Sequence, residues 1–279
     1  MFASKVATSL VLQFKDQVAV KIQRGDSSRD HGLTKTLEGL RLASVHAADA
    51  ILEQLLAWRE GALETSASGR ASARSSHGAA LKRQLVIEAF FMDAARCVVQ
   101  SSGSGSETIL IQKEIRDELE ELAFNWILNA DRFVTYDGLD AGVTGAMETE
   151  FSSGHSSHPS MVLKDKVVLS ASQLLGELSF VSSESLESIQ RRFLREFGQR
   201  IAEKDASSPA RQEAYGLCHA MRFVKLRGHT VEHLRASIGF LDAVFPLRHV
   251  APEKKSRPEQ ALCDLLTTIL SPLADGVDA

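Results

Sequence analysis

The stretch Leu81–Gln100 (LKRQLVIEAFFMDAARCVVQ) constrains the fold more than any other part of the chain. At helical spacing its apolar residues cover most of the circumference, and its polar residues fall on two narrow stripes. The first stripe holds Lys82, Asp93, Arg96 and Gln100, and the second holds Gln84 and Glu88. A surface helix usually has one apolar face, so a helix that is apolar on several sides is expected to lie between other helices.

Similar periodicity recurs along the chain and predicts about nine helices in all. Serine, threonine and proline residues mark several of the expected starts, and glycine or proline residues mark several ends. The expected helices lie at about 3–22, 33–60, 81–100, 107–134, 161–180, 209–227, 231–245 and 257–273. Between the fifth and the sixth of these ranges, Ser182, Ser183 and Glu184 are expected to cap a further helix, whose apolar residues recur at every fourth position: Ile189, Phe193, Phe197 and Ile201. We expect the 81–100 helix to pack against the helix of Trp126 and against the helix that ends near Trp58.

Two stretches between these helices lack an apolar period. Residues 61–78 are rich in Ser, Ala, Gly and Arg, and residues 137–160 are rich in Gly, Ser and Thr. Both are interpreted as flexible insertions in one helical region that spans residues 1–279. Hairpin signals are lacking and the other connections are short, which predicts an all-α protein with antiparallel neighbours. Because the helices are many and uneven, an irregular α-solenoid of HEAT or armadillo type is favoured over a closed four-helix bundle.

Composition argues against several classes of function. A net charge of −4 over 279 residues gives no strong field toward nucleic acid or an anionic membrane. No window holds eighteen uncharged apolar residues, and the N-terminus lacks a secretory pattern, which predicts a cytoplasmic protein without a membrane span. Cys97, Cys218 and Cys263 lie far apart inside helical patterns. They form no CxxC pair and are interpreted as reduced core thiols.

Residues 229–233 (HTVEH) match the H-x-x-E-H pattern of inverted zinc peptidases. That chemistry needs both histidines one turn apart on one helix face, with the glutamate as base. A glycine precedes the pattern and Thr230 is the expected helix cap, so His229 is expected to lie outside the helix. We therefore favour a helix entry with two partly exposed histidines. A zinc-dependent hydrolase that uses His229, Glu232 and His233 is the alternative.

The remaining candidates for chemistry are weaker. His155 and His158 form an isolated H-x-x-H in the 137–160 stretch, without cysteine or acidic partners, which favours a loop over a ligand pair. Cys97 lies in the middle of an apolar helix, which is the wrong place for a nucleophile. The sequence therefore predicts no catalytic residue, no cofactor site and no metal site.

Two charged stripes stand out on the expected helices. One is a run of acids that is interpreted as a solvated face: Glu114, Asp117, Glu118, Glu120 and Glu121. The other holds Arg191, Arg192 and Arg195, opposite a stripe of apolar residues. Its two interpretations are a solvated face with nearby acids as partners and a docking surface for an acidic protein partner.

Three blocks of the sequence together resemble the N-terminal region of the Furry family of cell-morphogenesis scaffolds. The first is LEQLLAWRE, which ends at Glu60, followed after a gap by LKRQLVIEAFFMDAARCVV. The second is LAFNWILNADR, which ends at Arg132. The third is MRFVKLRGHTVEHLRASIGFLDAV, followed by ALCDLLTTILSPLADG. The order and spacing match across most of the chain, and the two insertions are the places without a match.

The resemblance implies an extended helical-repeat scaffold and not an enzyme. Such proteins act with NDR-type kinases and MOB-type coactivators in polarised growth and cell shape, and some associate with microtubules. It also implies a place in the cytoplasm, at the cell cortex or at sites of polarised growth. Members are usually far longer, so the chain looks like the N-terminal piece of one or a shortened copy.

The resemblance assigns no site residue, because no block marks a kinase or MOB contact. Arg191, Arg192 and Arg195 therefore stay the candidate docking surface on the evidence of their pattern alone. The alternative for the whole chain is a generic helical-repeat adaptor for transport or tethering.

Overall fold

The computed structural model describes residues 2–68, 75–102, 111–135, 159–202, 209–224 and Gly239. Their regular secondary structure is α-helical, with no strand among them. The seven helices are α1 (Phe2–Arg24), α2 (His31–Ser68), α3 (Ser75–Ser102), α4 (Lys113–Thr135), α5 (Pro159–Leu178), α6 (Ser183–Ile201) and α7 (Pro209–Met221). The all-α prediction is confirmed for this part of the chain. The helices predicted over 231–245 and 257–273 lie outside it, apart from Gly239.

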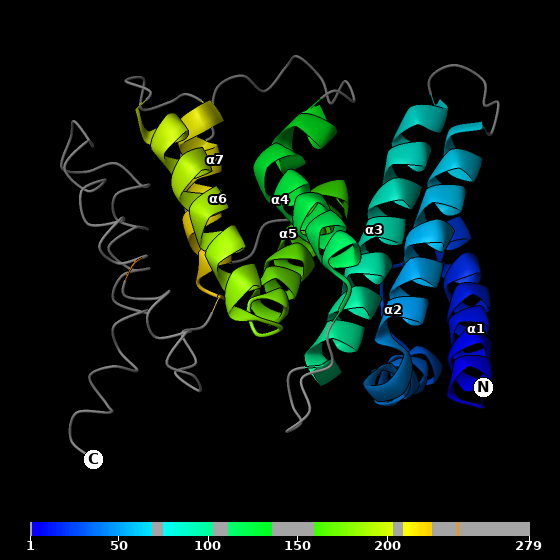
Figure 1. The fold of residues 1–279 in the computed structure, drawn as a ribbon. Coiled ribbons are helices and arrows are strands. Elements are labelled where there is room, and N and C mark those ends of the chain that lie inside the picture. Colours follow the sequence, from blue (N-terminus) through cyan, green and yellow to red (C-terminus); the bar gives the residue numbers. More distant parts are fainter. Residues whose placement is uncertain are drawn as a thin grey trace.

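The helices stack roughly in sequence order, from α1 and α2 at one side to α6 and α7 at the other (Figure 1). α1 packs on α2, α3 packs on α2 and α5, and α7 contacts α4, α5 and α6. In the second half of the stack, α4 and α6 lie in front of α5 and α7 (Figure 1). This half of the stack therefore has two layers, and the two charged stripes lie on the helices of its front layer.

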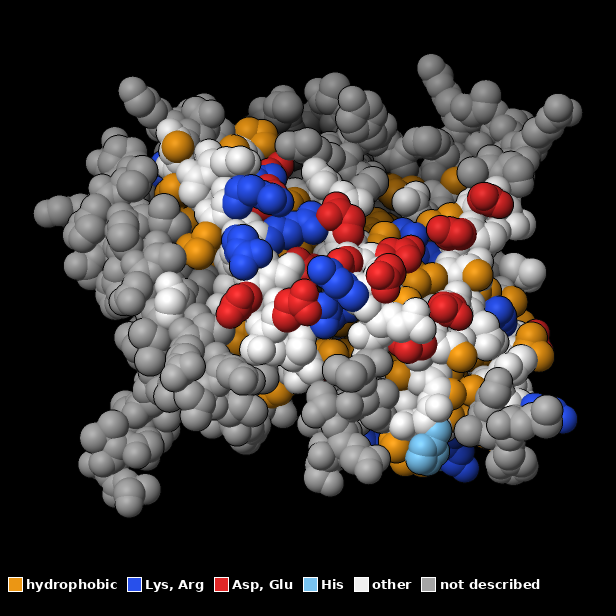
Figure 2. Space-filling model, viewed as in Figure 1, with side chains coloured by type: hydrophobic (Ala, Val, Ile, Leu, Met, Phe, Trp, Pro, Cys, Tyr) orange, Lys and Arg blue, Asp and Glu red, His pale blue; other side chains and the backbone are white. Residues whose placement is uncertain are grey.

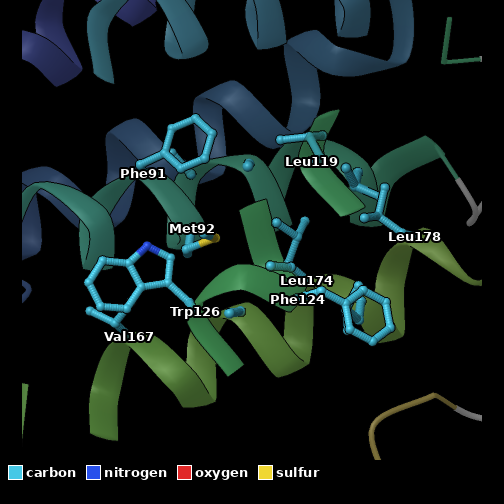
Figure 3. Close-up of a cluster of buried hydrophobic side chains, with 14 of the residues drawn as sticks. Phe91, Met92, Leu119, Phe124, Trp126, Val167, Leu174 and Leu178 are labelled. Carbon is cyan, nitrogen blue, oxygen red and sulfur yellow. The ribbon is translucent and has the colours of Figure 1, made fainter. Parts of the chain in front are cut away.

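The helix α3 is buried between neighbours, as its all-round apolar sequence predicts. Every residue from Leu85 to Ala95 is buried. The predicted contact with the Trp58 helix is confirmed, since α3 packs along α2. The predicted contact with the Trp126 helix is wrong in one respect, because α5 and not α4 lies along α3. Side chains of α4 still join the same core, where Trp126 lies among residues of α3 and α5 (Figure 3).

Two carboxylates are buried within that helix, and each has a charged partner. Glu88 accepts hydrogen bonds from Nε and an Nη of Arg59 on α2, at 2.8 and 2.6 Å. Asp93 accepts from Nε of Arg29 at 3.0 Å and from the Ser170 hydroxyl of α5 at 3.0 Å. Burying an unpaired charge is costly, so these partners are a condition for placing α3 in the interior.

The helix α2 is broken at Ala47, where φ is −151° and ψ is 34°. Val45, just before the break, is 44% exposed, whereas Leu52 and Leu55 beyond the break are fully buried. Gly39 is not the site of the break. A Cβ added there would lie 3.0 Å from a methyl carbon of Leu10, so the glycine lets α1 approach α2.

The prediction of a loop over residues 61–78 is wrong at both ends. α2 continues to Ser68, and α3 begins at Ser75. The Ser/Ala/Gly/Arg composition suggested a loop, but alanine and arginine are good helix formers and extend helices that are already fixed by packing. The second predicted insertion, 137–160, lies outside the described residues except for the first two residues of α5.

Candidate partner-docking surface on α4 and α6

The helix α6 begins where the sequence predicts. Ser182 is extended, with φ −161° and ψ 160°, and its hydroxyl accepts a hydrogen bond from the Ser185 amide at 3.1 Å. This is an N-cap, which satisfies one of the free amides of the first turn. The apolar stripe predicted for the helix is buried: Ile189, Phe193, Phe197 and Ile201. The opposite side of α6 is therefore fixed as an outward face.

The three candidate arginines lie on that side but differ in environment. Arg191 is 79% exposed and lies 3.8 Å from a carboxylate oxygen of Glu187. Arg195 is 61% exposed and lies 3.1 Å from Glu196. Arg192 is only 17% exposed, and its guanidinium lies 2.6 Å from Glu121 of α4 and 4.5 Å from the ring centre of Phe124. Arg191 and Arg195 thus have the outward exposure that docking needs, and Arg192 joins two helices.

Polar contacts connect residues 116–121 of α4 with residues 182–192 at the start of α6. Arg116 donates to the Ser182 hydroxyl at 3.0 Å and to a Glu184 oxygen at 3.1 Å, one turn before Ser188 donates to Glu120 at 3.1 Å. The contact between Arg192 and Glu121 follows at the next turn. Because both sets of residue numbers rise together, the two helices run parallel. We call this series of contacts the α4–α6 polar seam.

The acidic stripe of α4 is exposed, with one exception. Glu114, Asp117, Glu118 and Glu121 face solvent, whereas Glu120 is 5% exposed. The prediction that all five acids form a solvated face is therefore wrong for Glu120. Its position turns it toward α6, where burial raises the pKa of the carboxyl and the hydrogen bond from Ser188 acts in the opposite direction. The pKa of Glu121 is lowered by the hydrogen bond from Arg192.

The two stripes make one charged face. In Figure 2, Lys and Arg side chains gather over α6, and Asp and Glu side chains gather beside them over α4. Such a face steers and orients a partner of complementary charge more than it adds raw affinity.

Sequence periodicity places the arginines on α6 but does not reveal the polar seam. The seam joins Arg116 to Glu184 and Arg192 to Glu121 across about seventy residues of sequence. An arginine or glutamate beside an apolar stripe looks the same whether it meets water or another helix. The one available signal was the Ser182 cap, which fixes where α6 begins and thus which residues of α6 come level with α4.

The structure describes only some of the other candidate sites. No group of three or more His, Cys, Asp or Glu side chains is arranged to hold a metal ion among the described residues. Residues 229–233, His155 and His158 lie outside them, as does Cys263. Cys218 is buried, which raises the pKa of its thiol, and Cys97 is partly buried with its pKa raised in the same direction by burial. Both agree with inert core thiols.

A separate pocket of about 560 Å³ opens between α1, α2 and α3. Ile22, Trp58 and Ile87 give it apolar walls, and Arg83 is among the residues that line it. The helices that line it, α1, α2 and α3, lie at the opposite side of the stack from α6 and α7 (Figure 1). Within the described ranges no helix is long and apolar enough to cross a membrane.

Comparison with known proteins gives one match. A family model described as "Cell morphogenesis N-terminal" matches residues 150–279, which include α5, α6, α7 and the third of the Furry-like blocks. The first two blocks precede the matched residues. No curated protein and no solved structure was found to match the chain. Over residues 150–279 the chain therefore matches the N-terminal region of cell-morphogenesis proteins, which confirms the resemblance to the Furry family for that part.

Proposed function

We propose that the chain is a non-catalytic helical scaffold, the N-terminal part of a Furry-like protein, that supports polarised growth and cell morphogenesis. The match of residues 150–279 to the cell-morphogenesis family is the observation that carries the proposal. In this proposal the protein acts in the cytoplasm, at the cell cortex or at sites of polarised growth, and it has no cofactor.

The arrangement of α4–α7 supports a solenoid of HEAT or armadillo type. Two antiparallel helix pairs, α4 with α5 and α6 with α7, stack side by side, and the front helix of each pair lies in one layer (Figure 1). Solenoids present such layers as extended surfaces on which partners bind. The proposed partners are an NDR-type kinase and a MOB-type coactivator, with microtubules as a further candidate.

We assign the docking of an acidic segment of the kinase or coactivator to Arg191 and Arg195. These two side chains are 79% and 61% exposed, so both guanidinium groups are accessible to a partner. Arg192 is left out of the contact set because it is committed to Glu121 and Phe124. The contribution expected from exposed charges is mainly a faster association that weakens with salt.

The test is direct binding of the purified chain to a purified NDR-type kinase, a MOB-type coactivator and their complex. The double variant Arg191→Glu with Arg195→Glu should weaken binding at least tenfold at low salt. Lys35→Glu is the matched control, because Lys35 is an exposed cation on α2, away from α6. No binding of the unaltered chain to any of the three would refute the proposed partners. Equal loss in the double variant and the control would refute the assigned surface.

A further inference from the structure

The connection between α1 and α2, residues 25–30, gathers an unusual number of charges. Gly25 has φ +61° and ends α1. The carboxylate of Asp26 accepts from the amide and hydroxyl of Ser28, at 2.8 and 2.9 Å, and Lys21 lies 3.4 and 3.1 Å from Asp26 and Asp30. Asp30 also accepts from the Leu33 amide at 2.8 Å. The two carboxylates of this turn and Lys21 therefore satisfy one another and the start of α2.

Two further ammonium groups reach the same turn without a carboxylate partner among the described residues. Lys166 of α5 donates to the backbone carbonyl of Ser27, and its Nζ lies 5.8 Å from the ring centre of Phe90. Lys82 of α3 lies along Gly25, since a Cβ added to that glycine would be 2.7 Å from Lys82 Cε and 3.1 Å from its Nζ. Burial lowers the pKa of Lys166; the carboxylates of Asp93 and Asp26 act in the opposite direction, and the cations Arg29 and Lys21 act in the same direction as burial. The turn thus has positive charge in excess of its carboxylates.

Ser27 lies in the middle of this excess. It is partly exposed, and its hydroxyl makes no hydrogen bond within the described part of the chain. Because its own carbonyl already contacts Lys166, rotation of the side chain brings a group on Oγ within reach of the same ammonium. Ser28 is a poorer position for such a group. Its hydroxyl donates to Asp26, so a phosphate dianion on Ser28 would face that carboxylate.

We propose that the turn is an oxyanion site formed by Lys82 and Lys166, and that its occupant is a phosphate carried on Ser27. A serine/threonine kinase supplies it from ATP: an Oγ–P bond forms, the bond between the γ-phosphorus and the β–γ bridging oxygen breaks, and ADP leaves. The hydroxyl proton passes to the base of the kinase. The phosphate adds about −1.5 to −2 charge and three acceptor oxygens, which pair with the two ammonium groups and fix α1 and α2 on α3 and α5.

The experiment uses the full chain with phosphoserine incorporated at position 27 during synthesis. Phosphoserine at position 28 is the matched control. Lys166→Met and Lys82→Met remove each cation while keeping most of the side-chain volume, and circular dichroism confirms that these variants are folded. Thermal unfolding is measured for every form at pH 7.5 and at pH 5.5, on either side of the second phosphate pKa of about 6.

Phosphoserine at 27 should raise Tm by roughly 3 °C at pH 7.5 and by less at pH 5.5. The rise should be absent at position 28 and should fall by at least half in Lys166→Met and in Lys82→Met. A Tm that is unchanged or lower with phosphoserine at 27 overturns the proposal, as does a rise that survives the loss of both lysines. Inorganic phosphate is added to the unmodified chain as a separate arm. If it alone gives the rise and phosphoserine at 27 gives none, the site is one for free phosphate and the assigned occupant is wrong.

Discussion

Glu88 of α3 and Arg59 of α2 form a two-point ion pair in the interior of the stack. The carboxylate is 1% exposed and the guanidinium is 14% exposed, with donor–acceptor distances of 2.8 and 2.6 Å. The guanidinium also lies 5.5 Å from the ring centre of Phe91, so it contacts α3 through both charge and aromatic surface. This pair fixes the rotation of α3 against α2.

Replacing Arg59 by Met should destabilise the chain by about 3–5 kcal/mol, because Glu88 stays buried without its partner. The free energy of unfolding in urea measures the change. The double variant Arg59→Met with Glu88→Met should recover most of the loss, since apolar side chains of similar volume replace a buried pair well. Arg41→Met, which breaks an exposed pair with Glu38, is the control and should have little effect. A double variant as unstable as the single one would contradict this account.

Gly176 and Gly61 should respond to alanine in opposite directions. A Cβ on Gly176 of α5 would lie 2.5 Å from the carbonyl oxygen of Phe223, so Gly176→Ala should destabilise by roughly 1–3 kcal/mol through overpacking. Gly61 is helical with nothing within 4 Å of an added Cβ, so Gly61→Ala should stabilise by about 0.5–1 kcal/mol. Urea unfolding of both variants checks the pair of signs. A stabilising Gly176→Ala would show that the close approach of α5 to residue 223 is wrong, and a destabilising Gly61→Ala would contradict the open space at position 61.

Glu120→Gln should stabilise the chain at pH 7 and leave it unchanged in acid. Burial raises the pKa of Glu120 in the folded state above its unfolded value of about 4.3, so the ionised carboxylate weakens the fold at neutral pH. Below the unfolded pKa the carboxyl is protonated in both states, and the difference from glutamine disappears. The amide oxygen of glutamine still accepts from Ser188. Unfolding free energies of both proteins between pH 3 and pH 7 measure the effect, and a difference that grows in acid would contradict it.

Arg192→Ala and Arg191→Ala should separate structure from surface on the same helix. Arg192 loses its contacts with Glu121 and Phe124, which should cost roughly 1–2 kcal/mol. Arg191 is 79% exposed, so its replacement should stay within about 0.5 kcal/mol. Thermal or urea unfolding distinguishes the two variants. Equal losses would mean that Arg192 does not join α4 to α6.

Periodicity and capping predicted much of the local structure. The stripe of α6 from Ile189 to Ile201 is buried as expected, because that helix has one apolar side and one clear start. Cys218 of α7 is buried, as its place inside a helical pattern predicts. The break at Ala47 left no such signal, since alanine is the residue most compatible with a continuous helix.

The choice of neighbours was harder to predict than the helices. Trp126 suggested that α4 lies along α3, but an apolar stripe does not say which of several apolar helices it meets, and α5 takes that place. The pairs of Glu88 with Arg59 and of Asp93 with Arg29 have no pattern in sequence, because each joins residues that only the fold brings together. The exposure of Arg191 and Arg195 was predictable, whereas the burial of Arg192 depended on α4.

The α4–α6 polar seam gives the stack a directional stiffness. A bend that separates α4 from α6 breaks hydrogen bonds such as those of Arg116 and Ser188. Water replaces these partners, so the net cost in free energy is small. A bend that separates α7 from α5 breaks apolar contacts and exposes side chains such as Leu217 and Leu174. Full exposure of one such side chain costs about 1.5–3 kcal/mol. The stack of helices is therefore expected to bend more easily where α4 meets α6 than where α7 meets α5.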